Sequence, residues 1–205
     1  MTLPPSTTTP VSAATPAALR IIRDEHAALR AVLHSLQLMV ERGPGDDPEG
    51  FFGVLRSMLF YIDEYPERRH HPRESNFLFP RVLQRAAWAM PVISRLEQDH
   101  VHGERDVREL QHLLAGWELV GGSRRLPLAQ AVHRYVSFYL EHMRLEETQV
   151  LPLAQQYLGE DEWAELAEVF GANQDPMTGL HPREPVYDRL FTQIVMRAPA
   201  PIGLG

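Results

Sequence analysis

The chain has 205 residues, of which 44% are hydrophobic and 23% charged, so it is long enough to bury a core in one domain. Its net charge of −7 argues against nucleic-acid binding, which usually requires a basic surface. The absence of cysteine excludes disulfides, thiolate zinc sites, iron–sulfur clusters and cysteine nucleophiles, so any metal must be held by nitrogen and oxygen.

The first segment, residues 1–16, is rich in Pro, Thr, Ser and Ala and nearly uncharged, which is typical of a flexible tail. It lacks the basic start and apolar centre of a signal peptide. No apolar run in the sequence approaches the roughly 20 residues that span a bilayer. We therefore expect a cytoplasmic protein without a membrane partner.

Helical spacing of apolar residues begins directly after this tail. In the range 17–43 they recur at steps of three and four, with His26 in the middle of the apolar stripe. The run GPGDDPEG ends this first helix with turn-forming residues. A second helical pattern covers 51–90, with kinks or breaks expected at Pro72 and Pro80.

Two more long helices and a shorter one follow. The third begins after Pro91, a favoured first-turn residue, and a loop around GGSRR separates it from the fourth, at about 126–157. The run GEDEWAELAEVFGAN predicts a short amphipathic helix capped by Asp161. The C-terminal part holds one further helical pattern and then a Pro/Gly-rich tail.

Four long helices joined by short loops predict an all-α fold, an up-down-up-down four-helix bundle with a short extra C-terminal helical segment. We expect the bundle at 17–158, a helical extension at 159–197 and a tail at 198–205, in addition to the disordered tail at 1–16. The extension would pack across the bundle or cap an access path.

Three histidine–glutamate pairs stand out, because residues four apart on a helix lie on one face. Each pair therefore presents an imidazole and a carboxylate in the same direction. The lone His26 lies between Ile22 and Leu29 on the apolar stripe, so it points inward. The three pairs are His70 with Glu74, His100 with Glu104, and His142 with Glu146.

Burying these imidazoles and carboxylates without partners would cost several kcal/mol per charge. A pair of divalent or trivalent cations removes this cost, because each ligand then faces a positive charge. Four histidines and three carboxylates nearly fill two ions and leave a position for water, oxide or oxygen. Such ligands fit iron or manganese best, with zinc as a further option. The predicted metal ligands are His26, His70, Glu74, His100, Glu104, His142 and Glu146.

Several neighbours of these residues are open to a second interpretation. His70 and His71 lie about 100° apart around a helix, so only one can fully share the face of Glu74. The four-residue step selects His70, although a local bulge at Pro72 would exchange the two. Tyr135 and Tyr139 are expected to fill the core with satisfied hydroxyls, or else to hydrogen-bond ligands.

Other polar residues near the pairs are expected to have lesser roles. Glu25 and Glu147 are turned about 100° away from ligands, which favours a solvated position or one behind a ligand. The remaining histidines lack a carboxylate at the right step or point away from the site, and are expected to be structural or solvated; they are His34, His102, His112, His133 and His181.

The motifs resemble the hemerythrin-like proteins, which have the HHE cation-binding domain. The resemblance is carried by EHAALR, HHPRESNFLFP, DHVHGE and EHMRLEETQVLPL, and it covers 17–158. It implies a di-iron centre with a bridging oxo or hydroxo group. The implied iron ligands are His26, His70, His100 and His142, with Glu74 and Glu146 as carboxylates that can bridge.

Two positions depart from the oxygen-carrying hemerythrins. Those proteins have a second histidine on the third helix where this chain has Glu104, and an aspartate where it has Glu146. An added carboxylate favours ferric iron and works against reversible oxygen carriage. We therefore expect binding of, or reaction with, dioxygen, peroxide or nitric oxide, or iron sensing or storage. The alternatives are a di-iron enzyme that decomposes peroxide or oxidises iron, and a metal-free helical interaction module.

Overall fold

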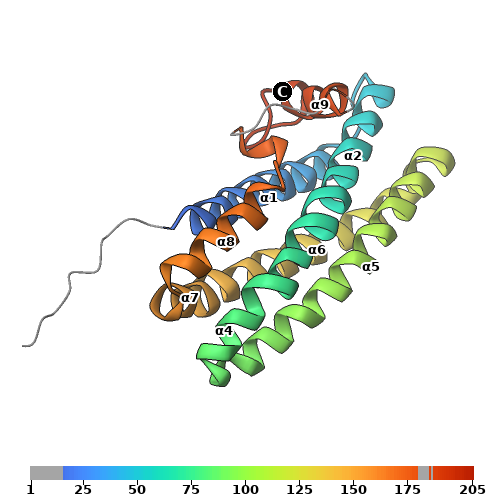
Figure 1. The fold of residues 1–205 in the computed structure, drawn as a ribbon. Coiled ribbons are helices and arrows are strands. Elements are labelled where there is room, and N and C mark those ends of the chain that lie inside the picture. Colours follow the sequence, from blue (N-terminus) through green and yellow to red (C-terminus); the bar gives the residue numbers. More distant parts are fainter. Residues whose placement is uncertain (1–15, 180–184, 186) are drawn as a thin grey trace, which may run out of the picture.

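The computed structural model describes residues 16–179, 185 and 187–205, and the regular secondary structure of these residues is entirely helical. Long helical rods lie side by side, and rods that follow one another along the chain run in opposite directions (Figure 1). They confirm the predicted all-α four-helix bundle. The rods are α1 (Ala17–Arg42), α2 (Pro48–Ile62) continued to α4 (Phe79–Arg85), α5 (Met90–Val120), and α6 (Arg125–Leu145) continued by α7 (Leu151–Tyr157).

The second and fourth rods widen into π-helical turns where they carry carboxylates. At the end of one such turn the N–H of Leu151 bonds the carbonyl of Glu146, five residues back, and Pro152 follows. A second turn ends in the same way before Pro80. The short segments of these rods are η1 (Asp63–His70), α3 (His71–Arg73), η2 (Glu74–Leu78) and η5 (Glu146–Val150).

The wide turns explain how the rods accommodate their prolines. A proline has no N–H to donate, and its ring clashes with the carbonyl four residues back. A π-turn moves that carbonyl away at the cost of one extra residue in the turn. The helix therefore continues through Pro72 and Pro80, and the breaks considered for these two positions do not occur.

The apolar core is divided into two clusters along the bundle. One contains Leu29, Val107 and Met143, and the other contains Ile22, Leu96 and Val150. Each rod thus passes from one cluster to the other about halfway along its length. The polar side chains described below lie in the layer between the two clusters, where hydrocarbon lies above and below them.

The described C-terminal residues add two α-helices to the bundle. Helix α8 (Glu160–Gly171) packs along α1, and α9 (Asp188–Arg197) packs along α2. Gly159 rather than Asp161 caps α8, because the Glu162 carboxylate accepts the Gly159 N–H at 3.0 Å. The predicted cap at Asp161 is therefore wrong.

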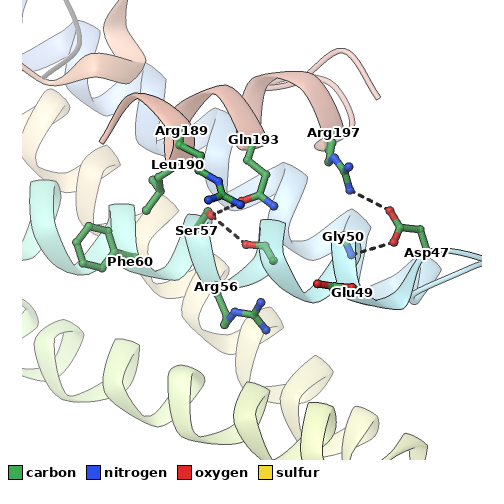
Figure 2. A pocket seen from close by; sticks show the side chains of 11 residues that line it. Asp47, Glu49, Gly50, Arg56, Ser57, Phe60, Arg189, Leu190, Gln193 and Arg197 are labelled. Atoms are coloured by element: carbon green, nitrogen blue, oxygen red, sulfur yellow. Dashed lines mark hydrogen bonds and ion pairs between the residues drawn. The ribbon is translucent and has the colours of Figure 1, made fainter. Parts of the chain in front are cut away.

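Helix α9 lies close to α2 at Gly50, as Figure 2 shows. A Cβ atom on Gly50 would come within 1.9 Å of the Arg197 guanidinium, and Arg197 also pairs with Asp47 at 2.9 Å. About two turns of α2 further on, Ser57 donates to Gln193 at 3.3 Å. In the described part of the chain, no helix combines the length and the hydropathy that a membrane span requires.

Candidate metal centre

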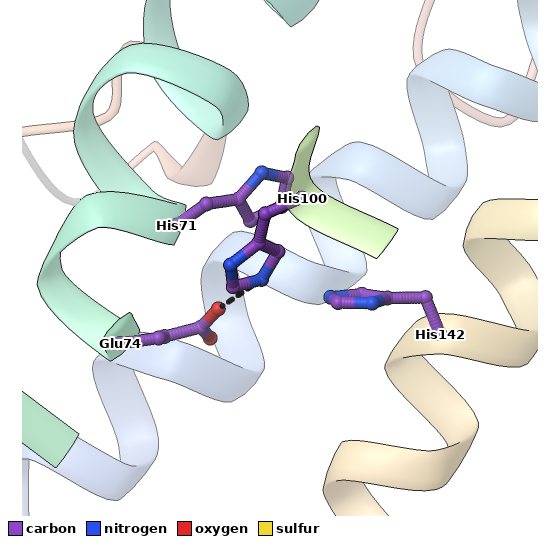
Figure 3. Close-up of side chains that lie close together, drawn as sticks. All are labelled: His71, Glu74, His100 and His142. Carbon is purple, nitrogen blue, oxygen red and sulfur yellow. Dashed lines mark ion pairs between the residues drawn. The ribbon is translucent and has the colours of Figure 1, made fainter. Parts of the chain in front are cut away.

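Seven side chains meet in the polar layer and form two groups that could each hold a metal ion. The ligand atoms of each group lie within 4.8 Å of one another. The three-histidine group is His71, Glu74, His100 and His142, and Figure 3 shows it. The two-histidine group is His26, His70, Glu74 and Glu146. Glu74 belongs to both groups.

The Glu74 carboxylate divides its two oxygens between the groups. Its Oε1 lies 2.7 Å from Nε2 of His70, and its Oε2 lies 3.3 Å from Nε2 of His100. Nε2 of His26 lies 3.4 Å from the Glu146 carboxylate. The Glu74 carboxylate, with one oxygen toward each group, can therefore bridge two cations.

In each of the five histidines, the ring nitrogen Nδ1 points away from the candidate cation position and faces a side-chain oxygen. The Nδ1 atoms pair with Glu147 at 2.9 Å for His26, Glu25 at 2.5 Å for His70, Glu67 at 3.1 Å for His71, Ser75 at 3.0 Å for His100, and Asp99 at 3.7 Å for His142. The carboxylates that hydrogen-bond His26, His70 and His71 hold the proton on Nδ1 and leave the lone pair of Nε2 for a cation. Glu25 and Glu147 thus take the positions behind ligands that the sequence left open.

Several buried polar atoms of the centre lack a hydrogen-bond partner among the residues that the structure describes. They are both oxygens of Glu74 and of Glu146, both ring nitrogens of His142 and Nε2 of His100. His70 lies within ion-pair distance of Glu74, but the pair does not have hydrogen-bond geometry. Each unsatisfied buried group costs roughly 1–3 kcal/mol, and a cation would satisfy several at once. Nitrogen and oxygen donors without sulfur suit iron, manganese or zinc, so the residues present fit a metal pair.

The buried carboxylates and imidazoles of the centre shift the pKa values of its histidines in opposite directions. Burial alone would lower the pKa of His70, but the Glu74 and Glu25 carboxylates outweigh it and raise the pKa to about 10. Burial likewise opposes the carboxylates around His26, whose pKa is raised well above its usual value. Burial and neighbouring imidazoles hold the pKa of His71 well below its usual value. Cations that bind the two-histidine group must therefore displace protons.

Six of the seven predicted ligands lie in these two groups, and Glu104 does not. The Glu104 side chain is half exposed and pairs with Arg108, one turn further along α5. Four residues of a regular α-helix turn through about 400°, so Glu104 is rotated about 40° past His100. The structure does not bring this carboxylate to either group, which corrects its expected inward orientation.

His71 joins the centre, although the four-residue step selected only His70. The two rings diverge from adjacent positions, and each serves a different group. The sequence analysis expected only one of the two to share the face of Glu74 fully, whereas the structure places each ring in a group with Glu74. Because the site has two cation positions, adjacent histidines that point in different directions can each bind a different cation.

A buried carboxylate, Glu67, connects the three-histidine group to two tyrosines. Its Oε1 accepts the hydroxyls of Tyr135, at 2.9 Å, and of Tyr139, while its Oε2 faces His71. Burial raises the pKa of Glu67 to about 8, against the lowering effect of the two hydroxyl donors. The prediction that both tyrosines fill the core with satisfied hydroxyls is confirmed.

Gly103 leaves the space in which this network forms, and its replacement tests the packing. A Cβ atom at Gly103 would lie 1.8 Å from the Tyr139 hydroxyl oxygen. We expect Gly103→Ala to lower the free energy of unfolding by about 1–3 kcal/mol, the usual cost of overpacking. Gly116→Ala on the same helix is the matched control, because its Cβ would meet nothing within 4 Å. Urea unfolding should show this control equal to the parent or slightly more stable; equal losses in both variants would contradict the prediction.

A small cavity of about 140 Å³ opens beside the three-histidine group. It is lined by His71 and His100, among others, with the half-exposed Glu104 at its edge. About 10% of the His100 side chain is exposed, more than for the other ligands that face Glu74. A small molecule can therefore reach the centre from solvent on this side.

A four-helix bundle with five histidines and two carboxylates in adjacent core groups defines a class of protein built to hold cations between its helices. A family model, the hemerythrin HHE cation binding domain, matches residues 17–154, and the chain belongs to this family. The match confirms the resemblance seen in the four sequence motifs. No curated protein matches the chain.

Proposed function

We propose that the chain holds two iron ions in its core and binds or reacts with dioxygen, peroxide or nitric oxide there. The observation that carries the proposal is the sharing of Glu74 between two groups whose remaining donors are histidine and glutamate. The nitrogen-rich, sulfur-free donor set and the family of the chain both favour iron. Iron bound in this way would supply electron exchange with the small molecule.

The cavity beside the three-histidine group supports a small molecule as the partner. Its volume of about 140 Å³ has room for only a few molecules of water size. Dioxygen, peroxide and nitric oxide fit such a space. His100 and His71 line this space, so the molecule would arrive next to the imidazoles.

Within the protein, the surrounding residues orient and shield the centre. Ser75 and Glu67 hold the imidazoles of His100 and His71 by their Nδ1 atoms, which directs Nε2 toward the cation position. The apolar clusters on both sides exclude bulk water from the buried ligands. Turnover of peroxide or oxidation of ferrous iron is the second candidate, favoured by the same solvent-open cavity.

Metal content tests the proposal directly. Aerobic purification followed by reconstitution with ferrous iron should give two iron ions per chain by mass spectrometry. The oxidised protein should absorb in the near ultraviolet, where zinc is silent, and bound iron should raise the melting temperature by mass action. Far fewer than two metal ions together with an unchanged melting temperature would instead favour a metal-free interaction module. Catalysis of peroxide loss no faster than with free iron would remove the second candidate.

A further inference from the structure

We propose that the segment after the bundle completes the two-histidine half of the metal centre, with Asn173 as a positioning residue that acts through Glu25 on His70. This inference rests on the proposed binding of two cations. Asn173 lies beyond residues 17–154, the range that matches the cation-binding family. The metal centre of this chain would thus include a residue outside the domain that defines the family.

A continuous chain of buried hydrogen bonds carries the inference. The Asn173 amide donates from Nδ2 to Oε1 of Glu25 at 2.7 Å. The other oxygen of Glu25, Oε2, accepts from Nδ1 of His70 at 2.5 Å. Glu25 and Asn173 are 5% and 1% exposed, so water does not compete for these bonds. Both Glu25 oxygens are held, and the carboxylate can present only one edge to the imidazole.

Neighbouring residues of α8 fasten the same segment to the second rod around His70. The Phe170 ring packs edge-on against the His70 ring, with centroids 5.8 Å apart. Arg73, three residues after His70, donates from Nε to the carbonyl of Val169 at 2.8 Å. The position of Asn173 is therefore fixed relative to the imidazole that it influences.

His70 differs in this respect from the other four histidines. Their Nδ1 partners all lie within the matched range: Glu147, Glu67, Ser75 and Asp99. Glu25 also lies on the bundle, but its orientation depends on an amide from outside it. An amide donor orients the carboxylate without adding a positive charge that would repel a cation. Among the described residues, the Oδ1 atom of Asn173 has no hydrogen-bond partner, so its Nδ2 bond to Glu25 is the amide contact that the structure shows.

Stepwise titration of the full-length chain with Zn²⁺, which is redox-inert, tests the inference. In Asn173→Ala we expect one of the two binding steps to weaken about 10–100-fold, as for other residues behind metal ligands, and the second step to stay unchanged. The matched control is Asn76→Ala, because Asn76 is exposed and is the other asparagine of the chain. It should bind both ions as the parent does.

A second variant guards against a failure of Asn173→Ala to fold. Asn173→Asp is nearly isosteric, but its carboxylate cannot donate to Glu25, so it should weaken the same step. If both variants bind two ions with the affinities of the parent, or if both steps weaken together with the stability of the metal-free protein, the positioning role is overturned. A parent protein with fewer than two binding steps would overturn the proposed two-cation function as well, which distinguishes the two failures.

Discussion

Glu74→Ala should abolish tight binding of both cations. Glu74 is fully buried, and it alone belongs to both ligand groups. Its loss removes an oxygen from each cation position and also the negative charge between them. We expect each affinity to fall by more than about 100-fold, since even residues behind ligands change affinity by 10–100-fold. Metal content after reconstitution should fall from two ions per chain to well below one.

Two further glutamates provide graded controls for this effect. Glu146 belongs only to the two-histidine group, so Glu146→Ala should weaken one ion and spare the other. Glu104 is half exposed and paired with Arg108, so Glu104→Ala should leave both ions in place. The order of metal content should therefore be Glu104→Ala equal to the parent, then Glu146→Ala, then Glu74→Ala. Loss of an ion in Glu104→Ala would restore this residue as a ligand and contradict the geometry.

The Glu74 variant is expected to fold, which makes its metal content interpretable. Both oxygens of Glu74 lack hydrogen-bond partners in the metal-free protein, so the side chain does not contribute a satisfied bond to the fold. The variant loses the ion pair between Glu74 and His70, but His70 can release its proton and keeps its hydrogen bond to Glu25. Circular dichroism should show the helix content of the parent, and a loss of helix would show that the metal result reflects unfolding.

The rods of the bundle could be predicted from the sequence because their signal is local. Apolar residues at steps of three and four place Ile22 and Leu29 on one stripe, and His26 between them inherits its inward direction. The same spacing located the long helices and most of the ligands. Periodicity reports only which face of a helix is buried. It does not report how the helix is wound at each residue.

The winding of the rods explains where the sequence interpretation of the site differed from the structure. Regular α-helical geometry forced a choice between His70 and His71, and it treated Glu104 like Glu74. In the structure π-turns flank α3 on both sides, whereas α5 is regular around Glu104. No pattern of apolar residues encodes such a turn, although a proline six residues after Glu74 and after Glu146 accompanies it in both rods.

Long-range partners were beyond prediction for a different reason. Asn173 and Glu25 are 148 residues apart, and their bond depends on how α8 packs on α1. A single sequence shows that Glu25 neighbours a ligand, but not what lies opposite it. The local sequence thus located most of the candidate ligands, whereas the tertiary structure alone shows the residues that orient them.

Asp175 makes the stability of the protein depend on pH, and the sign follows from its surroundings. Asp175 follows α8, and its side chain is buried, with 2% exposed. Its Oδ2 atom accepts a hydrogen bond from the Tyr61 hydroxyl at 2.7 Å, and its Oδ1 atom accepts one from the Met177 N–H at 2.8 Å. Burial raises its pKa to about 7, and the Glu25 charge adds to this rise, while the two hydrogen bonds and His70 oppose it. The folded protein therefore binds the proton more tightly than the unfolded chain does.

A group with a raised acid pKa stabilises the fold at low pH, and this contribution is lost as pH rises from about 4 to about 7. A shift of roughly three units corresponds to up to about 4 kcal/mol. Asp175→Asn is neutral at every pH, so its free energy of unfolding should exceed that of the parent by only about 1–2 kcal/mol near pH 5 and by about 4 kcal/mol near pH 8. Urea unfolding of chelator-treated protein measures both values. Asp161→Asn, at an exposed position of α8, should follow the parent at both pH values. Other buried carboxyls titrate in both proteins, so the test is the difference in free energy of unfolding between variant and parent. If that difference does not grow with pH, Asp175 is ionised in the folded protein as readily as in the unfolded chain, and the prediction is wrong.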